Sequence, residues 1–304
     1  MAKFIKKVLL FFALIAIIDV ATGYGFEYLR SHAKGGETQK NYYISEVCND
    51  DILIMGSSRA ARHYDPQVFM DSLGMSCYNC GEPGCGIITA YGRYGIVSSR
   101  HKPKFVIYEV SPGYDYYVMD DYSKYLGRLR QYADKPSVKK MYEELGDELE
   151  GLRLLSNMYK NNSFIVHNII DNLIKGDFVN GFEPLHGIIR SENKNKAIIT
   201  NNVIDKVKLS YIESLIVEMK DYNVTMCFMV SPRYISKEEA ALQASEFDPI
   251  KKLCNQYGIH FFNHTYMKGI SEDSILFQDY GHMNIRGAHL YSKYVCSEIK
   301  SLIK

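Results

Sequence analysis

The sequence predicts an α/β protein, a three-layer α/β/α sandwich around a central parallel sheet of five strands. Three observations predict this fold class. Short apolar runs are bounded by Gly, Ser or Pro, which is typical of strands buried on both faces. These runs alternate with longer helix-like stretches, which favours a parallel sheet covered by helices. Polar clusters directly follow several of the runs, where the carboxyl ends of parallel strands meet and ligands bind.

The first half of the predicted domain contains three strands. Residues 51–55 (DILIM) stop at Gly56-Ser57-Ser58, and a helical stretch over 59–74 follows, with Asp65-Pro66 as a helix start. The second strand (75–79) leads into a glycine-rich turn and then a helix over 87–100. The third strand, 104–110, ends at Ser111-Pro112-Gly113.

The second half begins with a stretch that interrupts the alternation of predicted strands and helices. Residues 114–205 are rich in Tyr at first and then charged and helix-like, so we predict a helical insertion or lid. A crossover helix over 206–220 leads to a fourth strand (224–230), and a helical stretch over 236–257 leads to a fifth (259–263). A final helix is predicted over about 286–303. The domain is therefore expected to span 51–304.

The composition limits the function classes. The 304 residues suffice for one large α/β domain or two small ones. Hydrophobic residues make up 46% and charged residues 23%, which is ordinary for a globular protein. A formal net charge of +1 argues against a nucleic-acid-binding protein. Neither GxxxxGK[ST] nor GxGxxG occurs, so no nucleotide cofactor is expected.

The N-terminus predicts a membrane anchor over residues 1–26, followed by a polar linker over 27–50. Three lysines within the first seven residues precede an unbroken apolar run from Val8 to Ile18, and the stretch continues past Asp19 to Phe26. A basic start followed by about 20 mostly apolar residues is typical of an uncleaved anchor. The lysines should then stay in the cytoplasm, with the domain in the periplasm or at the cell surface.

Two alternatives to the anchor remain at this stage. Ala21-x-Gly23 is a weak cleavage site, so the segment could be a signal peptide that is removed. The segment could also be a buried first helix, although such a helix would show polar residues every three or four positions.

The seven cysteines do not predict a metal or redox site. Cys77 and Cys80 form a CxxC motif, but no second cysteine pair follows and Cys77 lies on a predicted strand. Buried thiols behave as small apolar side chains, which is the role we expect. His260 and His264 would lie about 13 Å apart on an extended strand, too far to share a metal ion. We expect neither metal nor cofactor.

Ser58, Asp279 and His282 are the candidate catalytic residues. Ser58 follows a buried strand and precedes a predicted helix, so it lies on a sharp turn. Asp279 and His282 are three residues apart on a turn before the last helix, which can bring both side chains back to the sheet edge. Nucleophilic serine catalysis requires a histidine that accepts the serine proton and a carboxylate that orients the histidine. Ser57 is the alternative nucleophile.

The order GSSR, YNCGEPGCG, VIYEVSPGYD and DYGHMNIRGAHLYS resembles the motif blocks of the SGNH (GDSL-like) hydrolase superfamily. The resemblance covers about 51–115 and 206–300 and implies a flavodoxin-like fold with Ser58 as nucleophile. It implies an Asp279–His282 pair in the last block. In the second block it matches Asn79, a possible substrate-binding residue, and the oxyanion-hole glycine Gly84, with the amide of Ser58 as a second oxyanion donor.

The third block departs from the family pattern. The family has a Gly-x-Asn-Asp whose Asn completes the oxyanion hole, whereas this chain has Ser111-Pro112-Gly113-Tyr114-Asp115. Loss of one such donor lowers the rate by about 100- to 1000-fold. Arg59, Tyr114 or a backbone amide could replace it, and Arg233 after the fourth strand is a further possible substrate-binding residue. Envelope-facing relatives that add or remove O-acyl groups on polysaccharides share such a degenerate third block.

We therefore expect a membrane-tethered serine esterase or O-acyltransferase for acyl esters, in particular acetyl esters, of cell-envelope carbohydrate. Its expected partners are an acylated carbohydrate, the membrane at the N-terminal helix and envelope-polysaccharide machinery. The alternative is a non-catalytic SGNH-like protein that binds glycan or acts in assembly, because the missing asparagine is compatible with loss of catalysis.

Overall fold

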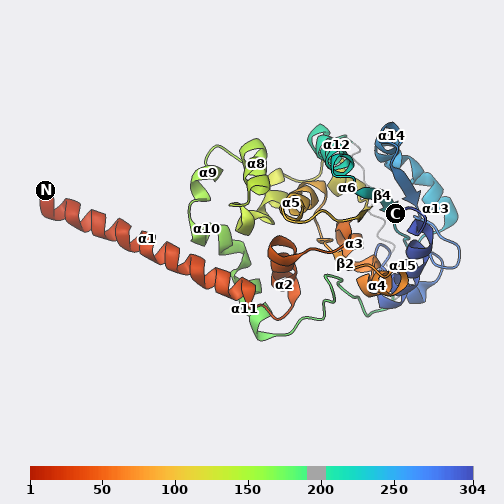
Figure 1. Ribbon diagram of the computed structural model, residues 1–304, viewed down its shortest axis with the longest axis horizontal. Helices are drawn as coiled ribbons and strands as arrows, with labels where there is room; N and C mark the ends of the chain where they lie inside the picture. The colour runs from red at the N-terminus through yellow and green to blue at the C-terminus, as the bar shows by residue number, and fades with distance from the viewer. Residues whose placement is uncertain (190–202, 304) are drawn as a thin grey trace.

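The computed structural model describes residues 1–189 and 203–303, and its centre is one parallel sheet (Figure 1). The strand order is β2-β1-β3-β4-β5, and every neighbouring pair is parallel. The strands are β1 (Ile52–Gly56), β2 (Cys77–Asn79), β3 (Phe105–Glu109), β4 (Thr225–Val230) and β5 (His260–Asn263). All five predicted strands are confirmed, with bounds that differ by one or two residues.

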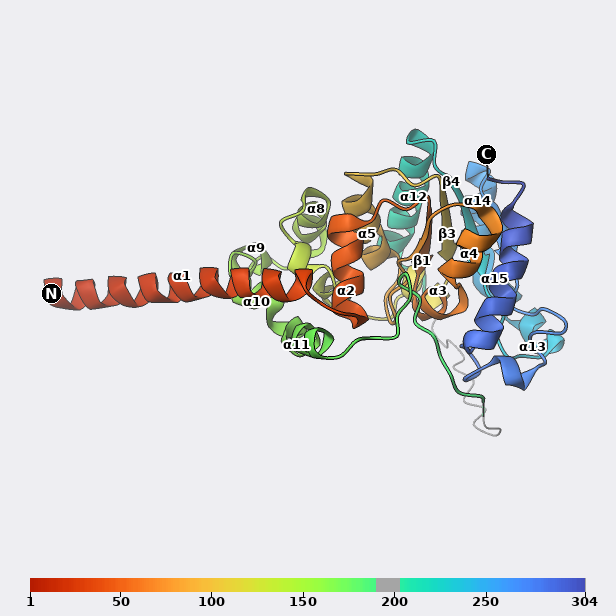
Figure 2. The same cartoon turned by 60° about the horizontal axis from the view of Figure 1, so that its bottom comes forward.

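Each face of the sheet has its own hydrophobic core. Along β1, Leu53 and Met55 belong to one buried cluster, whereas Ile52 and Ile54 belong to the other. This alternation follows from the two-residue side-chain period of a strand. The first cluster includes residues of α5 (Ile87–Ser98), α12 (Lys206–Asp221) and α14 (Asp248–Tyr257), together with residues of the predicted insertion. On the other face lie α4 (Pro66–Leu73) and α15 (Ile285–Ile299), so the fold has three layers (Figure 2).

The strand order places the candidate site. From β1 the chain moves outward to β2, and it then crosses back to β3 on the other side of β1. In doubly wound sheets of this order, the ligand crevice lies at the carboxyl ends of the two strands where the direction reverses. Here those ends are Gly56 of β1 and Glu109 of β3, so the residues that follow them are the first to examine.

Capping residues define the helices around this edge. Asp65 accepts a hydrogen bond from the Gln67 amide at the start of α4, as its sequence predicts, and Gly74 ends that helix with φ +69°. Asn284 caps α15 by accepting from the amides of Arg286 and Gly287. Short helices complete this part of the fold: α3 (Ser58–His63), α13 (Lys237–Leu242), η4 (Ala244–Phe247) and η5 (Ser274–Leu276).

The predicted insertion is helical over most of its described part. Its elements are α6 (Pro112–Asp115), α7 (Tyr122–Gly127), η2 (Arg130–Tyr132), α8 (Pro136–Leu145), α9 (Glu150–Arg153), α10 (Asn157–Asn161), η3 (Asn162–Phe164) and α11 (Ile165–Leu173). An irregular segment then passes along the domain to residue 189. The prediction for 190–202 lies outside the described residues.

The predicted linker, residues 27–50, is mostly helical instead. It contains the end of α1 (Ala2–Ser31), then α2 (Gly36–Tyr42) and the π-helix η1 (Tyr43–Val47). Buried Lys40 pairs with Glu183 at 3.0 Å and donates to the carbonyl of Gly81. A polar composition suggested a solvated linker, but these polar side chains have partners that are distant in the sequence.

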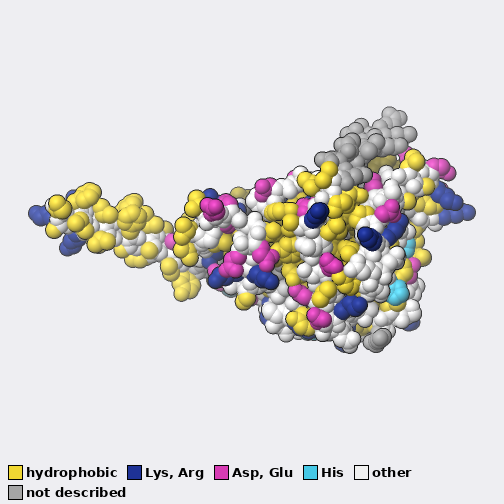
Figure 3. Space-filling view, turned by 90° about the horizontal axis from the view of Figure 1, so that it is seen from above, with side chains coloured by type: hydrophobic (Ala, Val, Ile, Leu, Met, Phe, Trp, Pro, Cys, Tyr) yellow, Lys and Arg dark blue, Asp and Glu magenta, His cyan; other side chains and the backbone are white. Residues whose placement is uncertain are grey.

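The membrane-spanning anchor predicted for residues 1–26 is not supported. Helix α1 projects from the domain and exposes apolar side chains, with lysines toward its free end (Figure 3). In the ranges 1–189 and 203–303, no helix combines the length and apolar character that crossing a membrane requires. The unbroken apolar run Val8–Ile18 is only about 16 Å long in a helix, roughly half of a ~30 Å hydrocarbon core.

Asp19, which interrupts the apolar run, attaches α1 to the insertion. Its carboxylate accepts from the hydroxyl of Ser156 at 2.6 Å and from the amides of Asn157 at 2.8 Å and Met158 at 3.0 Å. These amides are at the start of α10, where they have no partner within their own helix. The aspartate therefore has a structural role at the junction of α1 and α10.

Candidate active site

The turn after β1 exposes Ser58 and buries Ser57. Gly56 has φ +131°, and a Cβ at this position would clash with the carbonyl oxygen of Glu109, so only glycine fits where β1 and β3 approach. The hydroxyl of Ser57 is buried and has no partner within the described chain. Ser58, the first residue of α3, is partly exposed, and its Oγ lies 2.8 Å from Nε2 of His282. This geometry favours Ser58 over Ser57 as the nucleophile.

His282 connects Ser58 to Asp279. Nδ1 of His282 lies 3.0 Å from each carboxylate oxygen of Asp279. The same carboxylate accepts from the amides of Gly281 at 2.8 Å and His282 at 2.9 Å. Partial burial raises the pKa of Asp279, but the bonds from His282 and the two amides outweigh this, and the net pKa is below its ordinary value. The carboxylate is therefore ionised at neutral pH.

The three predicted catalytic residues thus form one hydrogen-bonded chain across 224 residues of sequence. The aspartate fixes the tautomer with hydrogen on Nδ1, which leaves Nε2 free to accept the Ser58 proton. Such an arrangement can generate a nucleophilic alkoxide at a sheet edge. Their catalytic role remains a prediction from this geometry.

Two backbone amides are available for an oxyanion. The amide of Ser58 begins α3 and has no intrahelical partner. Gly84 lies in the loop after β2 with φ +74°. Neither amide has an acceptor within the described residues. Both loops lie at the carboxyl edge of the sheet, so these N–H groups remain candidates for the oxyanion hole.

Replacing Gly84 by alanine is expected to lower both kcat and stability, whereas the same change at Gly74 should lower stability alone. Gly84 and Gly74 both have positive φ, at +74° and +69°, and a Cβ added at either position would meet no atom within 4 Å. Alanine should therefore cost each position about 1 kcal/mol of stability. Only Gly84→Ala should also reorient a backbone N–H that is a candidate donor to the oxyanion, and it should therefore reduce kcat by about tenfold or more. Ester kinetics and urea unfolding of both variants check this, and equal kcat values would contradict it.

The hydrogen bonds of the Asn79 side chain argue against the predicted role of Asn79 as a possible substrate-binding residue. It is fully buried, and its Nδ2 donates to the carbonyls of Ala60 at 2.7 Å and Tyr64 at 2.9 Å. Its Oδ1 accepts from the amide of Gly81 at 2.9 Å. The side chain thereby joins β2 to the end of α3 and shapes the loop that carries Gly84. All its polar atoms are occupied by backbone groups.

The turn after β3 contains no asparagine, as the sequence indicated, and Asp115 organises it. The buried carboxylate of Asp115 accepts from the hydroxyl of Tyr108 and the amide of Ser111, both at 2.6 Å. Burial raises the pKa of Asp115 to about 6, although these hydrogen bonds oppose the shift. Tyr114 is partly buried, and its backbone packs against Gly86. No described contact links the Tyr114 hydroxyl to the triad.

Arg59 extends from α3 to the carboxyl end of β3. Its Nε lies 3.2 Å from a carboxylate oxygen of Glu109, and its Nη2 donates to the carbonyl of Val110 and, at 3.4 Å, to Ser111 Oγ. Because most of the Arg59 guanidinium binds protein atoms, only part of it is left for the predicted contact with substrate. Arg233 follows β4, and its Nη1 donates to Gln243 at 2.9 Å.

A buried network that sequence reasoning missed supports the loop of His282. Nε2 of His63 accepts from the Met283 amide at 2.9 Å, and its Nδ1 lies 2.7 Å from Ser231 Oγ. Ser231 donates in turn to Glu109 at 2.8 Å. Burial, followed by the charge of His282 and neighbouring arginines, holds the pKa of His63 well below its ordinary value. The signal that could have indicated this network is Glu109, a charged residue inside the apolar run KFVIYEV.

Replacing Glu109 by alanine is expected to destabilise the fold by about 3–5 kcal/mol, because it leaves buried partners without their carboxylate. Glu109 also accepts from the hydroxyl of Tyr64 at 2.5 Å, besides its contacts with Arg59 and Ser231. Asp51→Ala is the control, since Asp51 pairs with exposed Lys104 and should cost less than about 1 kcal/mol. Urea unfolding measures both, and similar small losses would contradict the role of Glu109.

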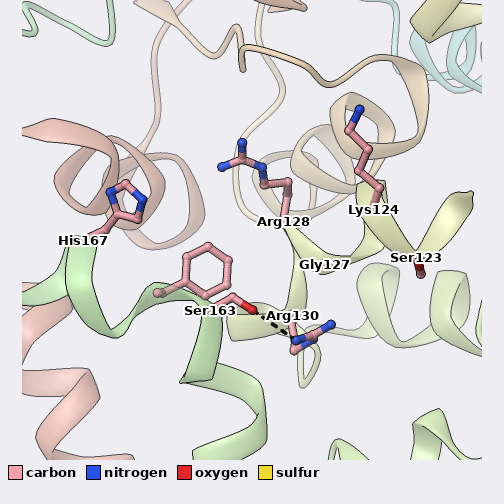
Figure 4. A pocket seen from close by; sticks show the side chains of 8 residues that line it. Ser123, Lys124, Gly127, Arg128, Arg130, Ser163 and His167 are labelled. Atoms are coloured by element: carbon pink, nitrogen blue, oxygen red, sulfur yellow. Dashed lines mark hydrogen bonds between the residues drawn. The ribbon is translucent and has the colours of Figure 1, made fainter. Parts of the chain in front are cut away.

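A separate cavity of about 330 Å³ lies in the helical insertion (Figure 4). Its lining includes Lys124, Arg128 and Arg130, and His167 of α11 lies at its side. Each of the three cations has an acidic partner: Asp120, Glu37 and Glu150 respectively. The cavity contains no triad residue, so we do not place the chemistry there.

The seven cysteines are free and buried, which confirms their predicted role as small apolar side chains. Across the described ranges, no group of three or more His, Cys, Asp or Glu side chains is arranged to hold a metal ion.

Comparisons with known proteins give structural similarity without sequence similarity. No family model and no curated protein sequence matches the chain. One similar structure is a proposed acylhydrolase from Bacteroides fragilis NCTC 9343, at 10% identity and a TM-score of 0.43, covering 88% of this chain and 98% of that one. Another is an active-site mutant of a family two carbohydrate esterase from Clostridium thermocellum in complex with cellohexaose. It has 12% identity and a TM-score of 0.38, covering 82% of this chain and 63% of that one.

Proposed function

We propose that the protein is an SGNH-type serine esterase or O-acyltransferase that acts on acetyl esters of carbohydrate. The observation that carries this proposal is the contact chain Ser58–His282–Asp279, with distances of 2.8 and 3.0 Å. A buried structural serine would not need a histidine at hydrogen-bonding distance whose other nitrogen faces a carboxylate. The motif order of the sequence supports the same reaction class.

The reaction proceeds in two halves. His282 accepts the proton of Ser58 through Nε2, and Ser58 Oγ attacks the carbonyl carbon of the ester. The negative oxygen of the tetrahedral intermediate is stabilised by the amides of Ser58 and Gly84. The C–O bond to the alcohol breaks, and the alcohol leaves with the proton from His282. Water or a second hydroxyl then attacks the acyl-Ser58 ester by the same steps, which regenerates the serine.

The openness of the site supports a large substrate. The side chain of His282 is 23% exposed and that of Asp279 is 53% exposed. Ser58 is itself partly exposed. A triad at an open sheet edge can be reached by an ester on a polymer, whereas an enclosed cavity would accept only a small molecule. This supports a carbohydrate chain as acyl carrier, and water or a sugar hydroxyl can reach the acyl-enzyme.

The location outside the cytoplasm, with the N-terminal helix near a membrane and envelope-polysaccharide machinery as partner, is also a proposal. It is supported by the lysines that precede the apolar run Val8–Ile18. A C-terminal alkaline phosphatase fusion in the native host tests it: phosphatase activity is expected, and an inactive but intact fusion would contradict it.

Labelling with a fluorophosphonate probe tests the proposed chemistry. The wild-type protein and Ser57→Ala should be labelled, because Ser57 is buried without a partner, while Ser58→Ala should not. This reaction reports an activated serine and needs no knowledge of the substrate. Failure to label a folded wild-type protein would sink the catalytic proposal and favour a glycan-binding protein that uses the same sheet edge.

A further inference from the structure

Helix α3 exposes two residues, and they lie on one face. Across Ser58–His63 only Ser58 and Arg62 are partly exposed, while the other four residues are buried. Residues four apart on a helix are neighbours, with roughly 6 Å between their Cβ atoms. Arg62 therefore lies beside Ser58, on the side from which an ester has to approach.

Arg62 has no partner for its charge. Its side chain makes no hydrogen bond or ion pair with any described residue, and its Nε is buried without an acceptor. The cations that line the cavity in the insertion differ, because Lys124 and Arg128 each have a carboxylate within 4 Å. A buried guanidinium N–H without an acceptor is costly, so an oxygen from outside the described residues, of water or of a ligand, is expected at this N–H.

Two further arginines surround the same sheet edge. Arg59 is 6% exposed, and its buried Nη1 has no hydrogen-bond partner. Among the described residues, the side chain of Arg233 donates to the neutral Gln243, and the amide of the next residue donates to the carbonyl of Tyr280 in the loop of Asp279 and His282. Burial lowers the pKa of Arg233 to about 10, and repulsion from Arg59 adds to the shift.

Two carboxylates, Glu109 and Glu246, interact with Arg59 and Arg233. Glu109 pairs with Arg59 but also accepts from Ser231 and Tyr64, so its oxygens are shared. Glu246 acts on Arg233, although Glu246 Oε2 is buried without a hydrogen-bond partner. Arg62 has neither of these carboxylates as a contact, and the carboxylate of the triad, Asp279, is bonded to His282.

We propose that Arg62, supported by Arg59 and Arg233, binds an acidic group of the substrate, a carboxylate or a phosphate on the sugar that carries the ester. This rests on the proposed esterase or acyltransferase function and names its substrate class, an acylated acidic glycan. A guanidinium presents two parallel N–H groups that match the oxygens of either anion. This contact holds the sugar beside Ser58 and strengthens binding without taking part in the chemistry.

The test compares acetylated sugars that differ only in charge: a neutral hexoside, the corresponding uronate and the corresponding hexose phosphate. Arg62→Gln should raise KM for the acidic esters by about 10- to 100-fold, the range of one charge-assisted hydrogen bond, and leave kcat unchanged. KM for the neutral ester should not change. The preferred acidic ester identifies carboxylate or phosphate as the native group.

Arg153→Gln is the control for net charge, because Arg153 is an exposed residue of α9 that pairs with Asp147. It should leave every KM unchanged. Equal KM values for Arg62→Gln and wild type on all three esters, with turnover intact, would overturn the acidic subsite while the esterase proposal stands. If no ester is turned over, calorimetric titration of Ser58→Ala with the unacetylated uronate and hexose phosphate measures binding directly. Binding that is lost when Arg62→Gln is added to Ser58→Ala would support the subsite. Absence of binding to Ser58→Ala would overturn it.

Discussion

Replacing Ser58 by alanine is expected to lower kcat for an acetylated sugar by about 10⁴- to 10⁶-fold, the range found when a serine nucleophile is removed. The reason is the position of Ser58 Oγ, 2.8 Å from Nε2 of His282, which makes this oxygen the atom that can form the acyl bond. Alanine removes one partly exposed oxygen at the first position of α3, so circular dichroism and urea unfolding should hardly change. Acetate release under saturating substrate measures the loss.

Ser57→Ala is the matched control for this result. It removes a hydroxyl from the preceding residue, where the oxygen is buried and has no partner in the described structure. This variant should keep wild-type kcat, and its stability should be equal or higher, because a polar atom without a partner is removed. Wild-type kcat in Ser58→Ala, or loss of kcat in Ser57→Ala alone, would show that the nucleophile is misassigned.

Asp279→Asn is expected to lower kcat by about 10⁴-fold, as for other serine triads that lose their carboxylate. Both oxygens of Asp279 lie 3.0 Å from Nδ1 of His282. An asparagine can turn its NH₂ group toward Nδ1, which places the imidazole hydrogen on Nε2 and prevents His282 from accepting the serine proton. The exposed position of Asp279 means that folding stability should change little. Ester kinetics at several pH values measure the effect.

Asp273→Asn is the control for the local role of an aspartate in a turn. Asp273 accepts from the Ile275 amide at 3.1 Å, as Asp279 accepts from the amides that follow it, but Asp273 has no contact with His282. It should retain wild-type kcat. Equal kcat values for Asp279→Asn and Asp273→Asn would contradict the role of the carboxylate in orienting His282.

The sequence by itself determined the sheet and the place of the site. Runs such as 104–110 are long enough and apolar enough to be strands buried on both faces, and this property is local. The polar segments around Ser58 and His282 were also predictable, because parallel strands bring their carboxyl ends to one edge whatever the distance in sequence. Their hydrogen bonds in the structure agree with the expected arrangement, while the reaction stays a prediction.

Only the tertiary structure decided which polar side chains are free for a ligand. The side chain of Asn79 is bonded to the carbonyl of Ala60 in α3, and that of Lys40 to Glu183. Arg62, in contrast, has no described partner. Whether a polar group is paired depends on segments that are distant in the sequence and fold against it. Which residues of α3 are buried depends on the same segments, so the composition of α3 alone does not predict it. That the charge of Arg62 beside Ser58 has no described partner could therefore not be predicted from the sequence.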